Sequence, residues 1–258
     1  MIEPVAERLR CRVHPGDESR TLIFLPGIHG DWTINTAFRV ALAGRARLVE
    51  FTYPRTLDWS IDDHASAIES ALEREQLTSG WLLGESFGSQ IVWPLLERKR
   101  IGVEGVVLAG GFGRHPWPPV VRLMHRATGL VRVHALRPAF RIYALAGRLR
   151  YRDSPEMAAS VREFLARRTE LDWQAVRHRL RLIESSDPSS VARRAKVPVF
   201  YISGALDPIV PWHASRRWLR KNCPGFREAR ILPLADHHVL GSGARAAAEQ
   251  VLRWMASS

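Results

Sequence analysis

The sequence predicts an α/β fold, in which helices cover both faces of a mainly parallel β-sheet. Short apolar runs that end at Gly or Pro alternate with helical segments over residues 1–113. The same alternation returns over residues 195–258, whereas residues 114–194 carry helical periodicity alone. We therefore expect residues 1–113 and 195–258 to form one α/β core and residues 114–194 to form a helical cap inserted into it.

Size and composition fit this organisation. The chain has 258 residues, of which 46% are hydrophobic, enough for a sizeable core. No apolar stretch approaches the roughly 18 residues that cross a bilayer, and the N-terminal residues lack the apolar segment of a secretory signal. Cys11 and Cys223 have no metal or redox spacing and are expected to be free thiols. Together these features lead us to expect a cytoplasmic protein.

The elements of the first core segment can be placed in order. Thr21–Leu25 is a continuous apolar run that stops at a Pro-Gly pair, as a strand buried on both faces does. Residues 60–76 have apolar side chains at helical spacing, with Asp62 and Asp63 in the first turn. The other elements expected here are a helix at 35–43, a strand at 47–53, a strand at 81–83, a helix at 86–98 and a strand at 105–109.

Beyond residue 113 the sequence indicates helices and then a return to the α/β pattern. Apolar residues within 120–131 share one helical face, and Ser154 precedes a proline at the first position of a helix expected over 155–168. The remaining elements expected are a helix at 172–184, a strand at 197–203, a helix at 213–221, a strand at 228–234 and a helix at 244–255.

Positive charge is concentrated in the expected cap. The chain has 38 Lys and Arg against 26 Asp and Glu, a net charge of +12. Residues 114–194 hold 17 arginines, no lysine and seven acidic residues, so that this segment alone carries +10. A basic block attracts anionic partners, which makes an anionic substrate, a membrane surface and nucleic acid candidate partners of the cap. The plainer alternative is that these arginines only cover solvated helix faces.

The central motif is Gly84-Glu85-Ser86-Phe87-Gly88, a G-x-S-x-G sequence between an expected strand and an expected helix. A serine hydroxyl is a poor nucleophile until a base takes its proton. A sharp strand-to-helix turn exposes the hydroxyl, and it needs small residues two positions to either side so that neighbouring backbone can pass close. The start of the helix also directs amides towards a developing oxyanion. In this context the motif predicts that Ser86 is a nucleophile.

Two later loops provide an acid and a base. Asp207 follows one expected strand, and His237 and His238 follow the last one. Loops after parallel strands emerge at the same edge of a sheet, so these side chains can reach Ser86. The order Ser86, Asp207, His237 is one of the known chain orders of a serine catalytic triad. His238 remains the alternative base.

The turn from Leu25 to Gly30 follows the first buried strand and is expected beside the nucleophile. The backbone amides of Ile28 and Phe87 are therefore the expected oxyanion donors. Six further side chains are candidates for substrate contact, although packing, solvent exposure or hydrogen bonding to backbone would also account for them. These candidates are His29, Glu85, Phe112, Trp117, Met124 and His238. No group of histidines has metal-ligand spacing, so no metal is assigned.

These motifs resemble those of the α/β-hydrolase superfamily, from about residue 20 to the end of the chain. Leu-Pro-Gly-Ile-His-Gly, Gly-Glu-Ser-Phe-Gly and Gly-Ala-Leu-Asp-Pro-Ile-Val-Pro are similar to segments of small esterases and thioesterase-like hydrolases of that superfamily. The resemblance implies an eight-stranded sheet, a helical cap after the sixth strand and no cofactor. It departs from the usual Gly-His at Ala235-Asp236-His237-His238, where His237 aligns with the family histidine because Ala-Asp-His recurs in relatives.

The sequence thus predicts a serine hydrolase that cleaves a carboxylic ester or thioester through an acyl-enzyme on Ser86, with the basic cap setting substrate choice. Two alternatives stay open. The same triad can transfer an acyl group to an acceptor other than water or hydrolyse a C–C bond. The fold can also be non-catalytic and present its arginine-rich cap to a membrane or to nucleic acid.

Overall fold

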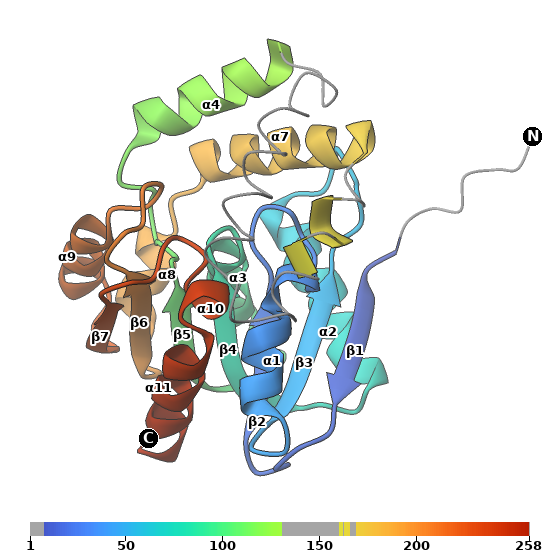
Figure 1. The fold of residues 1–258 in the computed structure, drawn as a ribbon, viewed down its shortest axis with the longest axis vertical. Helices are drawn as coiled ribbons and strands as arrows, with labels where there is room; N and C mark the ends of the chain where they lie inside the picture. The colour runs from blue at the N-terminus through green and yellow to red at the C-terminus, as the bar shows by residue number, and fades with distance from the viewer. Residues whose placement is uncertain (1–7, 131–159, 162, 166–168, 258) are drawn as a thin grey trace, which may run out of the picture.

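Seven strands form one sheet in the part of the chain that the structure describes. The computed structural model describes residues 8–130, 160–161, 163–165 and 169–257. The strands lie in the order β1-β3-β2-β4-β5-β6-β7 (Figure 1). They are β1 (Arg10–His14), β2 (Thr21–Leu25), β3 (Arg47–Thr52), β4 (Ser79–Glu85), β5 (Gly102–Ala109), β6 (Val199–Gly204) and β7 (Phe226–Leu232). β1 is antiparallel to β3, and all other neighbours are parallel.

The expected count of eight strands is wrong for the described residues, which contain seven. Ahead of β2 these residues contain the single strand β1. Because β1 runs antiparallel to β3 while β2 runs parallel to it, the chain must reverse direction between β1 and β2. Residues 15–20 make this reversal and so cannot form a second N-terminal strand. β1 is an edge strand with exposed and half-buried side chains, which is why it shows no apolar run in the sequence.

Helices cover both faces of the sheet, as the α/β prediction requires (Figure 1). Successive strand side chains point to opposite faces, so Leu22 and Phe24 pack in one apolar cluster while Ile23 and Leu25 pack in the other. The first cluster includes residues of α1 (Thr36–Leu42), α10 (Val239–Ser242) and α11 (Ala244–Ala256). The second includes residues of α2 (Ile61–Arg74), α3 (Gly88–Arg98), α8 (Ser189–Arg194) and α9 (Trp212–Asn222). The α/β fold is therefore confirmed.

Helix α2 shows how local sequence sets these boundaries. The Ser60 hydroxyl accepts a hydrogen bond from the Asp63 amide, and the Asp63 carboxylate accepts one from the Ser60 amide. This reciprocal pair satisfies two backbone donors that the first helical turn leaves free. The helix begins directly after Ser60, within one residue of the predicted start.

Two helices from the expected cap lie together above the carboxyl ends of the strands (Figure 1). They are α4 (Pro118–Leu130) and α7 (Glu170–Ser185). The Trp173 indole of α7 donates to the Thr128 carbonyl of α4 at 3.0 Å. Arg55, which follows β3, pairs with Asp172 of α7 at 2.7 Å. α7 is thus tied both to α4 and to a loop of the sheet.

The division into a core and a cap at residues 114–194 stays a proposal. Most of the helix expected at 155–168 lies outside the described residues, and the described positions 160–161 and 163–165 are helical. Val176, Leu180 and Ile183 of α7 are buried in the same apolar cluster as α2 and α3. α7 therefore packs directly on the core.

The two cysteines form no disulfide bond, as the sequence predicted. Cys11 and Cys223 are both free. Burial raises the pKa of Cys11 to about 11, and the nearby Glu75 carboxylate adds to the effect. This thiol therefore stays protonated and unreactive near neutral pH. Among the described residues, no helix has the length and apolar character needed to span a membrane.

Candidate active site

Ser86 lies on the sharp turn between β4 and α3. Its φ angle is +48°, in the left-handed region that strains a residue with a side chain. A Cβ atom on Gly88 would lie 2.1 Å from the carbonyl oxygen of Leu25, and one on Gly84 would lie 2.8 Å from Val92. These close approaches give the physical reason for glycine two residues before and after Ser86.

The structure brings together Ser86, His237 and Asp207, which are far apart in sequence. Nε2 of His237 lies 3.0 Å from Oγ of Ser86, and Nδ1 lies 2.8 Å from Oδ2 of Asp207. The other oxygen of Asp207 accepts hydrogen bonds from the amides of Ile209 and Val210 at 2.8 and 2.9 Å. These amides fix the carboxylate so that one oxygen faces the imidazole.

The pairing with Asp207 also sets the proton positions on His237. A carboxylate only accepts hydrogen bonds, so the proton of the neutral ring lies on Nδ1. Nε2 then presents its lone pair to the Ser86 hydroxyl. This arrangement is able to take a proton from Ser86 as its oxygen attacks an electrophile.

The two amides expected to bind the oxyanion belong to Phe87, which follows Ser86 in sequence, and to Ile28, in the turn after β2. Phe87 is the residue directly before α3. The turn that contains Ile28 is closed by a 2.9 Å hydrogen bond from the Gly30 amide to the Gly27 carbonyl, and a Cβ on Gly27 would be 3.5 Å from Cβ of Ser86. Among the described residues, no acceptor is bonded to the amides of Ile28 and Phe87. Both amides therefore remain available to an oxygen bound next to Ser86.

His238 has a different set of partners from His237. Its Nδ1 lies 2.6 Å from Oε1 of Glu85, and its Nε2 lies 2.9 Å from the Ile34 carbonyl. Asn35 also donates to Glu85, at 3.4 Å. A carbonyl and a carboxylate both accept, so each ring nitrogen of His238 carries a proton. The pair thus connects the end of β4 with the segment after β2 and the loop after β7.

Glu85 and His238 form a charged pair in a buried setting. Burial alone disfavours both charges, but the His238 imidazolium and its hydrogen bond lower the pKa of Glu85. Glu85 in turn raises the pKa of His238 above its ordinary value, against the opposing effect of burial. Each charge thus depends on the other, and removal of one leaves the second poorly compensated. Neither residue hydrogen-bonds Ser86 through its side chain within the described structure.

Glu85→Gln is expected to lower the free energy of unfolding by about 3 kcal/mol, the usual cost of breaking a buried pair. The loss should be largest between pH 4.5 and 6.5, the ordinary pKa values of the two groups. It should shrink as the pH rises through the raised pKa of His238, or falls through the lowered pKa of Glu85. Urea unfolding across this range measures it.

A matched control for this prediction is Glu249→Gln, because Glu249 is exposed and pairs with exposed Arg45. Removal of that exposed pair should change the free energy of unfolding far less, because solvent screens exposed charges. If the free energy of unfolding lost in Glu85→Gln stays constant from acidic to alkaline pH, that result would contradict a charged pair between Glu85 and His238.

The remaining candidate substrate-binding residues are spread over different environments. His29 is exposed and contacts Phe164 edge-on, with ring centroids 4.7 Å apart. Phe112 is buried in the core. Trp117 directly precedes α4 and Met124 lies in the middle of it, and both side chains are exposed. Their role in substrate binding remains a prediction.

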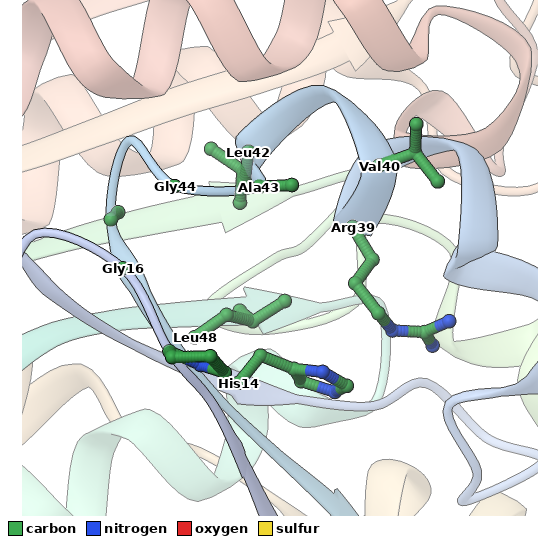
Figure 2. Close-up of a pocket in the computed structure, with 10 residues that line it drawn as sticks. His14, Gly16, Arg39, Val40, Leu42, Ala43, Gly44 and Leu48 are labelled. Atoms are coloured by element: carbon green, nitrogen blue, oxygen red, sulfur yellow. The ribbon is translucent and has the colours of Figure 1, made fainter.

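A hollow of about 590 Å³ lies between β1 and α1 (Figure 2). Its lining includes His14, Arg39, Val40 and Leu48, and none of the predicted site residues. His14 and Arg39 contact the buried Glu50 carboxylate, each at 2.8 Å. Since these basic groups are engaged with Glu50, we assign no function to the hollow.

Two side chains that contact predicted site residues were not themselves predicted from the sequence. Asn35 follows the oxyanion turn and reaches Glu85. Arg179 lies on α7, and its guanidinium donates to the Ile28 carbonyl at 2.9 Å. Asn35 has no motif that distinguishes it, and Arg179 is one of 17 arginines in its segment, so neither carried a local signal.

The sheet order, the strained serine turn after β4 and the loops after β6 and β7 together define an α/β hydrolase. The resemblance noted in the sequence is thus confirmed at the level of the superfamily. The chain belongs to the hydrolase family described as serine aminopeptidase, S33, whose sequence profile matches residues 46–242.

Solved structures share this fold over nearly the full chain, at low sequence identity. A thermophilic esterase from Thermogutta terrifontis is 15% identical with a TM-score of 0.77, covering 96% of this chain and 93% of its own. The enol-lactonase from Burkholderia xenovorans LB400 is 19% identical with a TM-score of 0.77, covering 96% of each. The putative non-heme bromoperoxidase BpoC from Mycobacterium tuberculosis H37Rv is 16% identical with a TM-score of 0.74, covering 99% and 98%. No curated protein sequence matches significantly.

Proposed function

We propose that this α/β hydrolase is a serine hydrolase that cleaves a carboxylic ester or thioester through an acyl-enzyme on Ser86. The observation that carries the proposal is the continuous contact from Oγ of Ser86 to Nε2 of His237 and from Nδ1 to Asp207. A nucleophile, a base and an orienting acid in hydrogen-bond contact are the arrangement that serine acyl transfer requires.

In the first half-reaction, His237 takes the Ser86 proton while Oγ attacks the carbonyl carbon. The carbonyl π electrons move to oxygen, and the amides of Ile28 and Phe87 stabilise the resulting oxyanion. Asp207 stabilises the imidazolium that forms. Collapse of the intermediate then breaks the bond to the alcohol or thiol, which leaves with the proton held by His237.

In the second half-reaction, water replaces the leaving group. His237 takes a proton from this water as its oxygen attacks the acyl carbon of the Ser86 ester. The same amides hold the second oxyanion, and its collapse returns the proton to Oγ of Ser86 and releases the carboxylic acid. No cofactor enters either half-reaction.

We further propose that the basic segment at residues 114–194 favours an anionic substrate. Within its described part, exposed arginines occur on both α4 and α7. They are Arg122, Arg126, Arg177 and Arg181. Charge of one sign on a surface raises the local concentration of ligands of the opposite sign, and added salt screens the effect.

The experiment that tests the reaction class is an activity profile over p-nitrophenyl esters and acyl thioesters of graded chain length. We expect hydrolysis of at least one of the two series, with a length optimum that reports the depth of the acyl site. Because of the family's description, an aminoacyl p-nitroanilide belongs in the same set. If only the anilide is cleaved, an amide substrate replaces the ester or thioester in the proposal. If none of the esters, thioesters and anilide is cleaved, the proposal is contradicted.

Salt dependence tests the anionic preference separately. The KM of an anionic ester should rise as salt increases, whereas the KM of a neutral ester of the same acyl length should stay within about twofold. An equal response of both esters to salt, or none from either, would remove the support for an anionic substrate. Product analysis with added alcohol acceptors distinguishes hydrolysis from acyl transfer.

A further inference from the structure

Arg179 connects helix α7 to the turn beside Ser86. Its side chain is 3% exposed. One terminal nitrogen donates to the Ile28 carbonyl at 2.9 Å, and the other donates to the Pro54 carbonyl at 3.0 Å. The guanidinium carbon also lies 5.5 Å from the centre of the Tyr53 ring. A single side chain thus binds the loops that follow β2 and β3, over which α7 runs (Figure 1).

The turn that Arg179 binds is held at three points. The Gly30 amide donates to the Gly27 carbonyl at 2.9 Å, and the Tyr53 amide donates to the Gly30 carbonyl at 2.8 Å. These two bonds fix the ends of the turn. The peptide between Ile28 and His29 is the centre of the turn, and among the described residues its carbonyl is held by Arg179.

The conformation of Ile28 therefore depends on Arg179. The amide of Ile28 is a proposed oxyanion donor, and its carbonyl is bonded to the guanidinium. Fixing the carbonyl fixes the ψ angle of Ile28, and so limits movement of the amide relative to Ser86. Gly30 adds to this dependence, because a Cβ there would lie 2.7 Å from the guanidinium, which shows how closely Arg179 packs on the turn.

We propose that Arg179 is a positioning residue, which holds the Ile28 amide in the geometry that stabilises the oxyanion and so couples helix α7 to catalysis. This inference rests on the proposed serine hydrolase function. An amide held in advance stabilises the transition state more than the ground state, since charge develops on the substrate oxygen only during attack. The loss on removing Arg179 should therefore appear in kcat.

The test compares Arg179→Met, Arg179→Lys and Arg245→Met. Methionine keeps much of the buried volume without the donors, lysine can still donate to one carbonyl, and Arg245 is an exposed arginine on α11, outside the basic segment. We expect Arg179→Met to lower kcat by about tenfold to a hundredfold with KM within about threefold. Arg179→Lys should recover part of the loss, and Arg245→Met should match the wild type within about twofold.

Reaction with a fluorophosphonate provides a second readout. Oγ of Ser86 attacks phosphorus, the P–F bond breaks, fluoride leaves, and the serine proton passes to His237. The phosphoryl oxygen occupies the place of the oxyanion, so the rate constant of labelling should fall in Arg179→Met in parallel with kcat. Circular dichroism and thermal unfolding establish that each variant is folded. If Arg179→Met does not fold, Arg179→Lys carries the test.

The outcomes separate the inference from the proposed function. Suppose that the fluorophosphonate labels the wild type at Ser86, and that a folded Arg179 variant is labelled and turns over substrate at the wild-type rate. This result would overturn the positioning role of Arg179 and leave the serine hydrolase proposal in place. A variant with raised KM and unchanged kcat would also overturn it, because it would assign Arg179 to substrate binding. A wild type that does not label at Ser86 would overturn the serine hydrolase proposal and this inference with it.

Discussion

Ser86→Ala is expected to lower kcat on the best ester substrate by about 10⁶-fold, leaving only the rate that binding and the oxyanion amides provide. The reason is chemical: without Oγ no acyl-enzyme forms, and the His237 imidazole has no hydroxyl to deprotonate. Because the Ser86 side chain is small and lies on a turn whose shape is set by flanking glycines, the variant should fold. Steady-state kinetics with the ester identified in the activity profile measures the loss.

Ser79→Ala is the matched control, because Ser79 is an exposed serine at the opposite end of the same strand β4. Its activity should remain within about twofold of the wild type. A Ser86→Ala enzyme that keeps more than about one hundredth of the wild-type kcat would contradict a covalent role for Ser86, since such activity requires another nucleophile.

His237→Gln should lower kcat by about 10⁴-fold to 10⁶-fold. Glutamine is similar in size and able to hydrogen-bond, but it cannot accept the Ser86 proton and return it to the leaving group. The expected loss follows from the contacts of His237 with both Ser86 and Asp207. Kinetics of acylation and deacylation should both slow, because the same imidazole serves both half-reactions.

His238→Gln provides the comparison that separates the two adjacent histidines. The ring nitrogens of His238 are engaged with Glu85 and the Ile34 carbonyl, so its loss should act through stability and loop position. We expect the kcat of His238→Gln to be at least about a hundredfold higher than the kcat of His237→Gln. We also expect His238→Gln to unfold at a lower temperature than the wild type. The opposite ranking in two folded variants would exchange the roles of these histidines.

Much of the fold was predictable because its buried strands are continuous apolar runs. Thr21–Leu25 is buried along its full length, and the structure places β2 at these residues. β1 could not be found in this way, since its edge position leaves its side chains exposed or half-buried. α10 has four residues, too few for a periodic pattern to show.

The candidate site also has some features that the sequence predicts and others that it does not. Ser86, Asp207 and His237 each follow a strand, so the general rule for parallel sheets was enough to place them together. The choice between His237 and His238 depends on the shape of their loop. Asp236 accepts a hydrogen bond from the His238 amide, which makes it a turn residue and helps to direct the two rings to different partners. The direction in which each histidine ring points follows from the local backbone geometry, and the spacing of residues in the sequence does not reveal it.

The contact of Arg179 with the oxyanion turn was beyond sequence reasoning for a different reason. It depends on how α7 packs over the loops after β2 and β3, and that packing joins residues about 150 positions apart. The sequence showed that this segment is rich in arginine but could not separate a buried arginine from its solvated neighbours. Only the arrangement of the helix on the sheet does so.

Mass spectrometry after reaction with a fluorophosphonate tests the central claim most directly. We predict a single phosphonyl adduct, located on the peptide that contains Ser86, with a rate that falls by orders of magnitude in His237→Gln. An unmodified wild-type protein, an adduct on another residue, or an equal rate in His237→Gln would contradict the claim that His237 activates Ser86 as the nucleophile.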